Sequence, residues 1–141
     1  MKIKLIFLGK KKNSALNDLI MDYFSRIQKE INSELVFISN YKKKSSIINN
    51  DDIVILVDEK GKHYDSISFS RNVKNKIQNS PKRIVFIVGD AYGFPLDFYK
   101  RCDEAISLSK LTFPHEIARL IVVEQIYRAI TIIKNHPYHH E

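Results

Sequence analysis

The chain has 141 residues, of which 44% are hydrophobic, and a formal net charge of +7 at pH 7. This length suits one domain around one core, and no run approaches the roughly 20 apolar residues of a membrane-spanning helix. The single cysteine, Cys102, excludes an internal disulfide framework and a cysteine-based zinc cluster. We expect one cytoplasmic domain over residues 1–141, and the positive charge favours a partner rich in phosphate groups.

Strand and helix patterns alternate along the chain. In chain order we predict a strand at 2–8, a helix at 14–31, a strand at 34–39, a loop at 40–52, a strand at 53–57, a helix at 67–77, a strand at 84–88, a helix opened by Pro95, a strand at 105–108 and a helix at 114–134. Apolar residues recur every three or four positions in the helices, while continuous apolar runs are typical of parallel strands buried on both faces. This alternation predicts an α/β fold with a mainly parallel sheet flanked by helices.

The predicted last helix, residues 114–134, carries apolar residues around almost its whole circumference. Such a helix must be covered on most sides. In so small a domain a second subunit is the natural cover, and we therefore expect a homodimer. The alternative is a central helix that is buried within its own chain.

Three segments follow predicted strands and should converge at one edge of the sheet: Val57–Asp58, Gly89–Gly93 and Leu108–Phe113. Glycine lets a backbone approach a ligand closely, which suits a nucleotide-like cofactor. The glycine pair alone is more often a simple turn than a binding loop, and it lacks the dinucleotide-binding and P-loop signatures.

The tail at residues 135–141 concentrates three histidines, a tyrosine and a glutamate. A frayed, solvated end is one interpretation. The short histidine spacing lacks the helical frame that zinc enzymes use, so we assign no metal site. The functional interpretation is that the tail folds over the mouth of the cofactor pocket and brings Tyr138 and His139 to a substrate base.

Three separated motifs, Ser107–His115, Glu124–Ala129 and Pro137–His139, occur in the order that is typical of the RlmH family of bacterial ribosomal RNA methyltransferases. The chain resembles that family over essentially its whole length, and most strongly after about Ile84. The opening strand and Val88–Gly93 agree with the family as well.

The resemblance implies a SPOUT-type α/β fold, in which a C-terminal trefoil knot forms the pocket for S-adenosyl-L-methionine, and a homodimeric assembly. It also implies N3-methylation of a pseudouridine in 23S ribosomal RNA, on the assembled ribosome. Carried over by position, the cofactor-binding residues are Val57, Gly89, Leu108, Ser109, Lys110, Leu111, Thr112 and Phe113. All of them belong to the three segments that follow strands.

The proton on N3 must leave during this reaction, and we expect Tyr138 or His139 to accept it or to orient a water molecule. Candidates for RNA contacts are Arg119, Arg128 and His140. The two arginines are candidates for intersubunit contacts as well, and a buried helix-to-helix salt bridge with Glu124 is an equal alternative for both. The lysine clusters 10–12 and 42–44 either grip RNA or form solvated loops.

The chain departs from the family pattern at several positions. Asp90 stands where a second glycine is common, and its charge either repels the methionine carboxylate or binds a ribose hydroxyl. His140 replaces a more usual Arg or Lys, Val57 replaces a Leu, and the connection 40–52 is short and lacks a helix that many members of the family carry. Asp90 motivates an alternative function, a non-catalytic knotted dimer that binds RNA or the ribosome. A flavodoxin-like nucleotide binder is a third interpretation, which rests on the α/β pattern alone.

Overall fold

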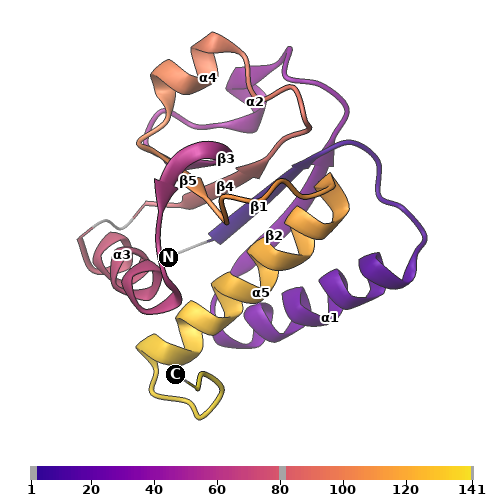
Figure 1. Ribbon diagram of the computed structural model, residues 1–141. Coiled ribbons are helices and arrows are strands. Elements are labelled where there is room, and N and C mark those ends of the chain that lie inside the picture. The colour runs from indigo at the N-terminus through magenta and orange to yellow at the C-terminus, as the bar shows by residue number, and fades with distance from the viewer. Residues whose placement is uncertain (1–2, 80–81, 141) are drawn as a thin grey trace.

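The computed structural model describes residues 3–79 and 82–140 (Figure 1). Its elements in chain order are β1 Ile3–Leu8, α1 Ala15–Glu30, β2 Ser33–Ile38, α2 Lys44–Ile47, β3 Ile53–His63, α3 Ser66–Asn79, β4 Ile84–Val88, α4 Leu96–Arg101, β5 Glu104–Ser107 and α5 His115–Ile133. The predicted start of the first strand, Lys2, and the tail residue Glu141 lie outside the described residues. The predicted alternation of strands and helices is confirmed.

The five strands form one sheet in the order β2-β1-β4-β3-β5, and every neighbouring pair is parallel. All five carboxyl ends therefore lie at the same edge of the sheet, as the sequence predicted. The order is not sequential, so the chain crosses over the sheet between strands. The trefoil knot that the resemblance implies stays a prediction.

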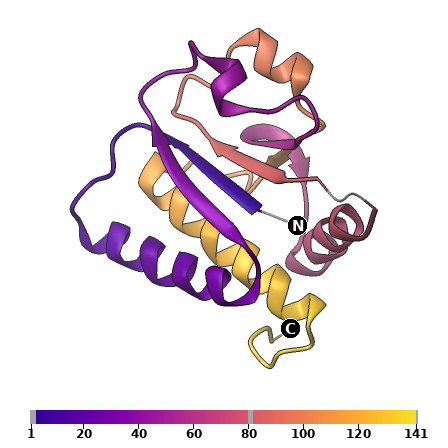
Figure 2. The same ribbon diagram turned by 180° about the vertical axis from the view of Figure 1, so that it is seen from behind.

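Helices cover both faces of the sheet (Figure 2). Alternate residues of β1 explain how one strand serves both faces: Leu5 and Phe7 pack with α1, α3 and α5, while Ile6 packs with α2 and α4. All three side chains are fully buried. The sheet is thus the middle layer of three, and its buried faces leave the strand ends as the place for a site.

The strand β3 is longer than predicted. The apolar run ends at Val57, where pairing with β4 ends, but the strand continues through charged residues to His63. Val57 and Lys62 both pair with Ile106 of β5, so the intervening residues bulge outward. The outer part of β3 is largely exposed and therefore polar, which is why its sequence does not read as a buried strand.

A second difference falls in residues 40–52, which were predicted to be a loop without a helix. One helical turn, α2, forms there and buries Ile47, and the next residue, Ile48, is also buried. Both isoleucines pack in the same cluster as Phe98 of α4. A single turn is too short to produce a periodic pattern, so the prediction could not detect it.

The helix α5 is covered mainly by its own chain. The helices α1 and α3 pack against it, and Val123, Ile126 and Ala129 are almost completely buried. The central-helix alternative thus accounts for most of its apolar surface. One side nevertheless remains open, because Ile117 is 37% exposed.

Candidate active site

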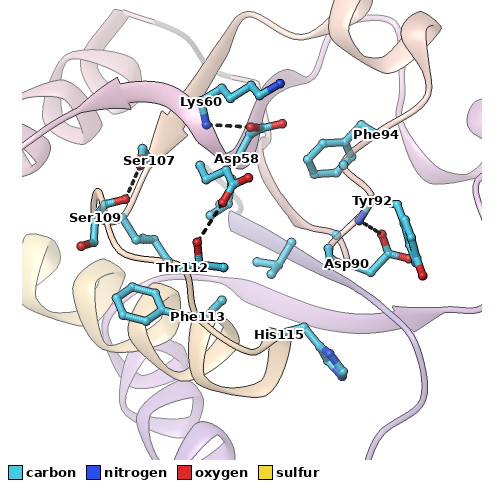
Figure 3. Close-up of a pocket in the computed structure, with 18 of the residues that line it drawn as sticks. Asp58, Lys60, Asp90, Tyr92, Phe94, Ser107, Ser109, Thr112, Phe113 and His115 are labelled. Carbon is cyan, nitrogen blue, oxygen red and sulfur yellow. Dashed lines mark hydrogen bonds between the residues drawn. The ribbon is translucent and has the colours of Figure 1, made fainter.

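A pocket of about 380 Å³ lies at the carboxyl ends of β3, β4 and β5, beside the start of α5 (Figure 3). It brings together seven of the eight predicted cofactor residues: Val57, Gly89, Leu108, Ser109, Leu111, Thr112 and Phe113. Lys110 is exposed and does not line the pocket. The three segments converge as predicted, because parallel strands end at a common edge.

Asp58 organises the side of the pocket that β3 supplies. Its carboxylate accepts a hydrogen bond from the backbone N–H of Lys60 at 2.8 Å and another from the hydroxyl of Tyr99. Burial and this contact raise the pKa of Tyr99, so its phenol remains a donor. The Tyr99 hydroxyl also accepts from the backbone N–H of Phe94 at 3.3 Å, which ties the loop after β4 to β3.

The loop after β4 is a tight turn. The backbone N–H of Gly93 donates to the Asp90 carbonyl at 3.3 Å, and the N–H of Tyr92 donates to the Asp90 carboxylate at 2.9 Å. Gly93 has φ +77°, a conformation that favours glycine. The Asp90 carboxylate is therefore part of the turn itself, a role that the sequence did not reveal.

Position 89 requires glycine because neighbouring side chains leave no room for a Cβ. A Cβ at this position would lie 2.7 Å from the Tyr41 hydroxyl and 3.2 Å from the Phe94 ring. Within the described part of the chain, the Tyr41 hydroxyl is buried without a hydrogen-bond partner. Burial, reinforced by the charge of Asp90, raises the pKa of Tyr41.

The loop after β5 is held from both ends. The Ser107 hydroxyl donates to the Ser109 carbonyl at 2.9 Å, and the Ser109 hydroxyl accepts from the Leu111 N–H at 3.0 Å. Thr112 donates its hydroxyl to the Glu59 carboxylate of β3 at 3.3 Å. The loop is thus fixed before any ligand arrives, which lowers the ordering cost of binding.

The structure adds pocket residues that the sequence did not single out, notably Phe94, Tyr99, His115 and Ala118. His115 and Ala118 belong to the first turn of α5. Tyr99 lies on α4, one helical turn after Pro95, and nothing in the sequence marks its side chain as directed toward β3. The labelled side chains of Figure 3 show that the loop after β4 and the loop after β5 face each other across the pocket.

The tail does not fold over the pocket of its own subunit, and a position over the pocket of a partner subunit stays a prediction. Tyr138 donates to the Glu124 carboxylate at 3.1 Å, and its hydroxyl lies 3.2 Å from that of Tyr23. The pocket adjoins the opposite end of α5, and a helix of 19 residues spans about 28 Å at 1.5 Å per residue. In Figure 1 the C-terminus accordingly lies beyond the far end of α5.

The cations predicted to contact RNA have different surroundings. Arg119 is 2% exposed and donates to the Leu8 carbonyl at 2.5 Å. The side chain is therefore not accessible for a direct RNA contact in this fold. Arg128 pairs with Glu124, four residues earlier on the same helix, at 2.5 Å, and its guanidinium lies over the Tyr138 ring. Only His140 is exposed.

Residues 3–79 and 82–140 contain neither a candidate metal site nor a candidate membrane-spanning helix. No group of three or more His, Cys, Asp or Glu side chains there could hold a metal ion. No helix in the same ranges is both long enough and apolar enough to cross a membrane. The pocket at the strand ends is the candidate site because it contains seven of the eight predicted cofactor residues.

The parallel sheet and the glycine-containing loop after β4 at its carboxyl edge define an α/β protein with a pocket that suits a nucleotide-like cofactor. Residues 1–139 match the family described as predicted SPOUT methyltransferase. The chain is 40% identical to the ribosomal RNA large subunit methyltransferase H of Christiangramia forsetii over 99% of each chain. It is also 40% identical to the protein of the same name from Parabacteroides distasonis over the full length of both.

A solved structure of a probable methylase family protein from Haemophilus influenzae Rd KW20 shares the fold, with a TM-score of 0.51 at 11% identity over 99% of this chain and 70% of that one. The chain therefore belongs to the SPOUT methyltransferases. Within them it belongs to the family of the ribosomal RNA large subunit methyltransferases H.

The cofactor of this class of methyltransferase is S-adenosylmethionine, and the pocket residues fit it. The volume of about 380 Å³ lies within the range of small-molecule sites, roughly 300–1,000 Å³. Val57, Leu108 and Phe113 offer apolar surface to a purine ring. The carboxylates of Asp58 and Glu59 suit ribose hydroxyls, which donate hydrogen bonds, and a positively charged sulfonium.

Proposed function

We propose that this chain, as a single-domain subunit of a homodimer, methylates N3 of a pseudouridine in 23S ribosomal RNA on the assembled ribosome. The observation that carries the proposal is the pocket at the carboxyl ends of β3, β4 and β5, in a chain of this family. The names of its relatives supply the RNA substrate. The net charge of +7 suits a substrate rich in phosphate.

S-adenosylmethionine would supply a methyl group that is already activated by its sulfonium. The chain contributes position, because internal hydrogen bonds hold the loops after β4 and β5 and Val57, Leu108 and Phe113 supply apolar surface to the pocket. Positioning of this kind can account for a large part of an enzymatic rate acceleration.

The dimer is inferred from one side of α5. Ile117, Ile121, Glu124 and Arg128 follow one another at helical spacing, and we call them the α5 stripe; all four are exposed or half-buried. Pairing of two α5 stripes about a two-fold axis perpendicular to the helices makes the helices antiparallel. The Arg128 end of one subunit then lies opposite the Ile117 end, and hence the pocket, of its partner.

This arrangement would bring the tail to the partner's pocket. Tyr138 contacts Glu124 and His139 contacts Arg128, and both partners belong to the α5 stripe. His139 Nδ1 lies 3.0 Å from Arg128 Nη1. A guanidinium only donates, so Nδ1 accepts and the ring proton is on Nε2. We infer that His139 donates its Nε2–H to a carbonyl oxygen of the base and stabilises the negative charge left on the base when N3 gives its proton to solvent water.

Tyr138 is better placed to hold the tail than to accept a proton. Burial, its contact with Tyr23 and the nearby Glu124 carboxylate all raise the pKa of Tyr138. Its hydroxyl is already donated to Glu124. We therefore assign Tyr138 a positioning role and His139 the contact with substrate.

The test measures methyl transfer from labelled S-adenosylmethionine to ribosomes that lack the modification, with the product nucleoside located by mass spectrometry. His139→Ala should lower kcat by about 10²-fold, the usual cost of removing one donor to a developing negative charge. His139→Gln keeps a donor and should lose much less. Equal losses in the two variants would favour a proton-accepting role, and absence of methylation by the wild type, with intact binding to ribosomes, would favour the non-catalytic alternative.

Mixing experiments test whether the tail acts across the dimer. A pocket variant, Gly89→Val, and a tail variant, His139→Ala, should each be nearly inactive. After subunit exchange, half of the dimers are mixed and each has one intact site, so activity should return to about a quarter of wild type. No recovery, with exchange verified by mass, would contradict a tail that acts on the partner.

A further inference from the structure

Tyr92 is 95% exposed, the most exposed of the large hydrophobic side chains in the described residues. Its backbone is nevertheless fixed, because its N–H donates to the Asp90 carboxylate and the turn closes between Asp90 and Gly93. The backbone N–H of Phe94, two residues further on, donates to the Tyr99 hydroxyl. A rigid turn thus carries an aromatic ring into solvent.

This ring lies at the rim of the cofactor pocket (Figure 3). Its turn follows β4, which lies between β1 and β3 in the sheet. Because all five strands are parallel, the lysine clusters 10–12 and 42–44, which follow β1 and β2, share that edge of the sheet. Lys60, on the outer part of β3, lines the side of the pocket that β3 supplies.

Proteins that bind single-stranded nucleic acids combine exposed aromatic rings with nearby cationic side chains, as Tyr92 and the lysines do here. Lysines attract the phosphates, and each base stacks on the ring through a face that all bases possess. The internal hydrogen bonds of the turn reduce the ordering cost of such a contact. Stacking of one base on an aromatic side chain typically strengthens binding by about tenfold or more.

We propose that Tyr92 is a stacking platform for an unpaired nucleobase of the RNA that adjoins the target nucleotide, with the lysine clusters 10–12 and 42–44 holding the flanking phosphates. This inference rests on the proposed function, since it names the part of the RNA substrate that the pocket rim recognises. Tyr92 thereby contributes affinity for unpaired RNA beside the target nucleotide, outside the chemistry of methyl transfer.

The chain contains no tryptophan, so Tyr92→Trp places a single fluorophore at the proposed contact. A single-stranded oligoribonucleotide should quench this fluorescence by stacking, whereas polyphosphate, which binds lysines but has no bases, should not. The matched control is Gln28→Trp, at an exposed position near the end of α1. Its fluorescence should respond to neither polyanion.

Kinetics on ribosomes provide the second readout. Tyr92→Ala should raise the KM for ribosomes about tenfold with little change in kcat, and Tyr92→Phe should restore the wild-type KM, since it keeps the stacking face. Calorimetry should give the same affinity for S-adenosylmethionine in all three proteins.

Three results would overturn the proposal. Equal quenching of the Tyr92→Trp protein by polyphosphate and RNA would indicate charge alone, and quenching by S-adenosylmethionine without RNA would make the ring a cover for the cofactor. Fluorescence that depends on protein concentration alone would place the ring in the dimer interface. Failure of the proposed function gives a different result, because wild-type protein would then not methylate ribosomes whatever the fluorescence of the Tyr92→Trp variant reports.

Discussion

Arg119 shows how one buried cation can organise a loop at the edge of the site. Its guanidinium donates to the carbonyls of Leu8 and Lys10 at 2.5 and 3.3 Å and lies over the rings of Phe7 and Phe37. Burial lowers the pKa of Arg119, and the charge of Glu116 only partly opposes this effect. Arg119 therefore holds the start of the basic loop 9–12 in place without touching the pocket.

Replacing Arg119 should loosen that loop more than it destabilises the fold. Arg119→Met loses two charge-assisted hydrogen bonds but also removes a cation that is costly to bury, so the free energy of unfolding should change by only about 1 kcal/mol. Limited trypsin digestion should cleave after Lys10–Lys12 at least several-fold faster. Cleavage after Lys42–Lys44 is the internal control and should keep its rate; acceleration at both loops would indicate general unfolding instead.

At the scale of the element, the long strand β3 couples the sheet to the pocket. Its inner part pairs with β4, and its outer part crosses β5 at Gly61. A Cβ at Gly61 would lie 2.6 Å from backbone atoms of Ala105 and Ile106. Backbone cannot move aside cheaply, so this glycine permits the crossing that places Asp58 and Glu59 beside the loop after β5.

Gly61→Ala should therefore damage stability and cofactor binding together. Overpacking of this kind typically costs about 1–3 kcal/mol, and the separation of β3 from β5 should weaken S-adenosylmethionine binding at least tenfold. Thermal unfolding and titration calorimetry measure the two effects. The control is His63→Ala, at an exposed position of the same strand, which should change neither stability nor cofactor affinity. A Gly61→Ala protein with normal affinity for S-adenosylmethionine would show that the crossing does not shape the pocket.

At the scale of the whole molecule, the two edges of the sheet have different roles. The carboxyl edge bears the pocket, whereas the amino edge bears a cluster of ion pairs just before β3 and β4. Asp52 accepts from Arg83 at 2.6 and 2.8 Å and from the Asn49 N–H at 2.7 Å. Burial acts to raise the pKa of Asp52, but these contacts outweigh it and lower the pKa below its usual value.

A lowered pKa makes Asp52 a source of stability that acid removes. The contribution is complete above the unfolded pKa of about 3.9 and is lost as the pH falls through the lower folded value. Asp52→Asn should cost about 1–3 kcal/mol at pH 7, with a difference from wild type that shrinks below about pH 4. Urea unfolding from pH 7 to pH 3 measures this.

Affinity for S-adenosylmethionine at pH 7 should be unchanged in Asp52→Asn, because the substitution lies at the edge away from the pocket. Asp97→Asn is the control, since Asp97 is paired with Lys44 at 3.5 Å on an exposed surface and should matter little. A constant deficit for Asp52→Asn at every pH would rule out the titration of this carboxylate as the cause.

The sequence by itself determined the alternation of elements and most of the pocket. Runs such as Ile84–Val88 report burial on both faces, and parallel strands necessarily end at one edge, so segments from three strands could be placed together before any contact was known. Lys110 falls outside the pocket because the direction of a side chain within a turn is not encoded in strand order.

Tertiary structure alone decided the rest. The outer part of β3 is polar, so its strand conformation depends on pairing with β5 and leaves no periodic signal. Arg119 is buried by contacts with residues more than 100 positions away, and the tail lies against α1 and α5 at the end far from the pocket. Periodicity reports the local environment of a segment, whereas these features depend on which distant surfaces meet when the chain packs.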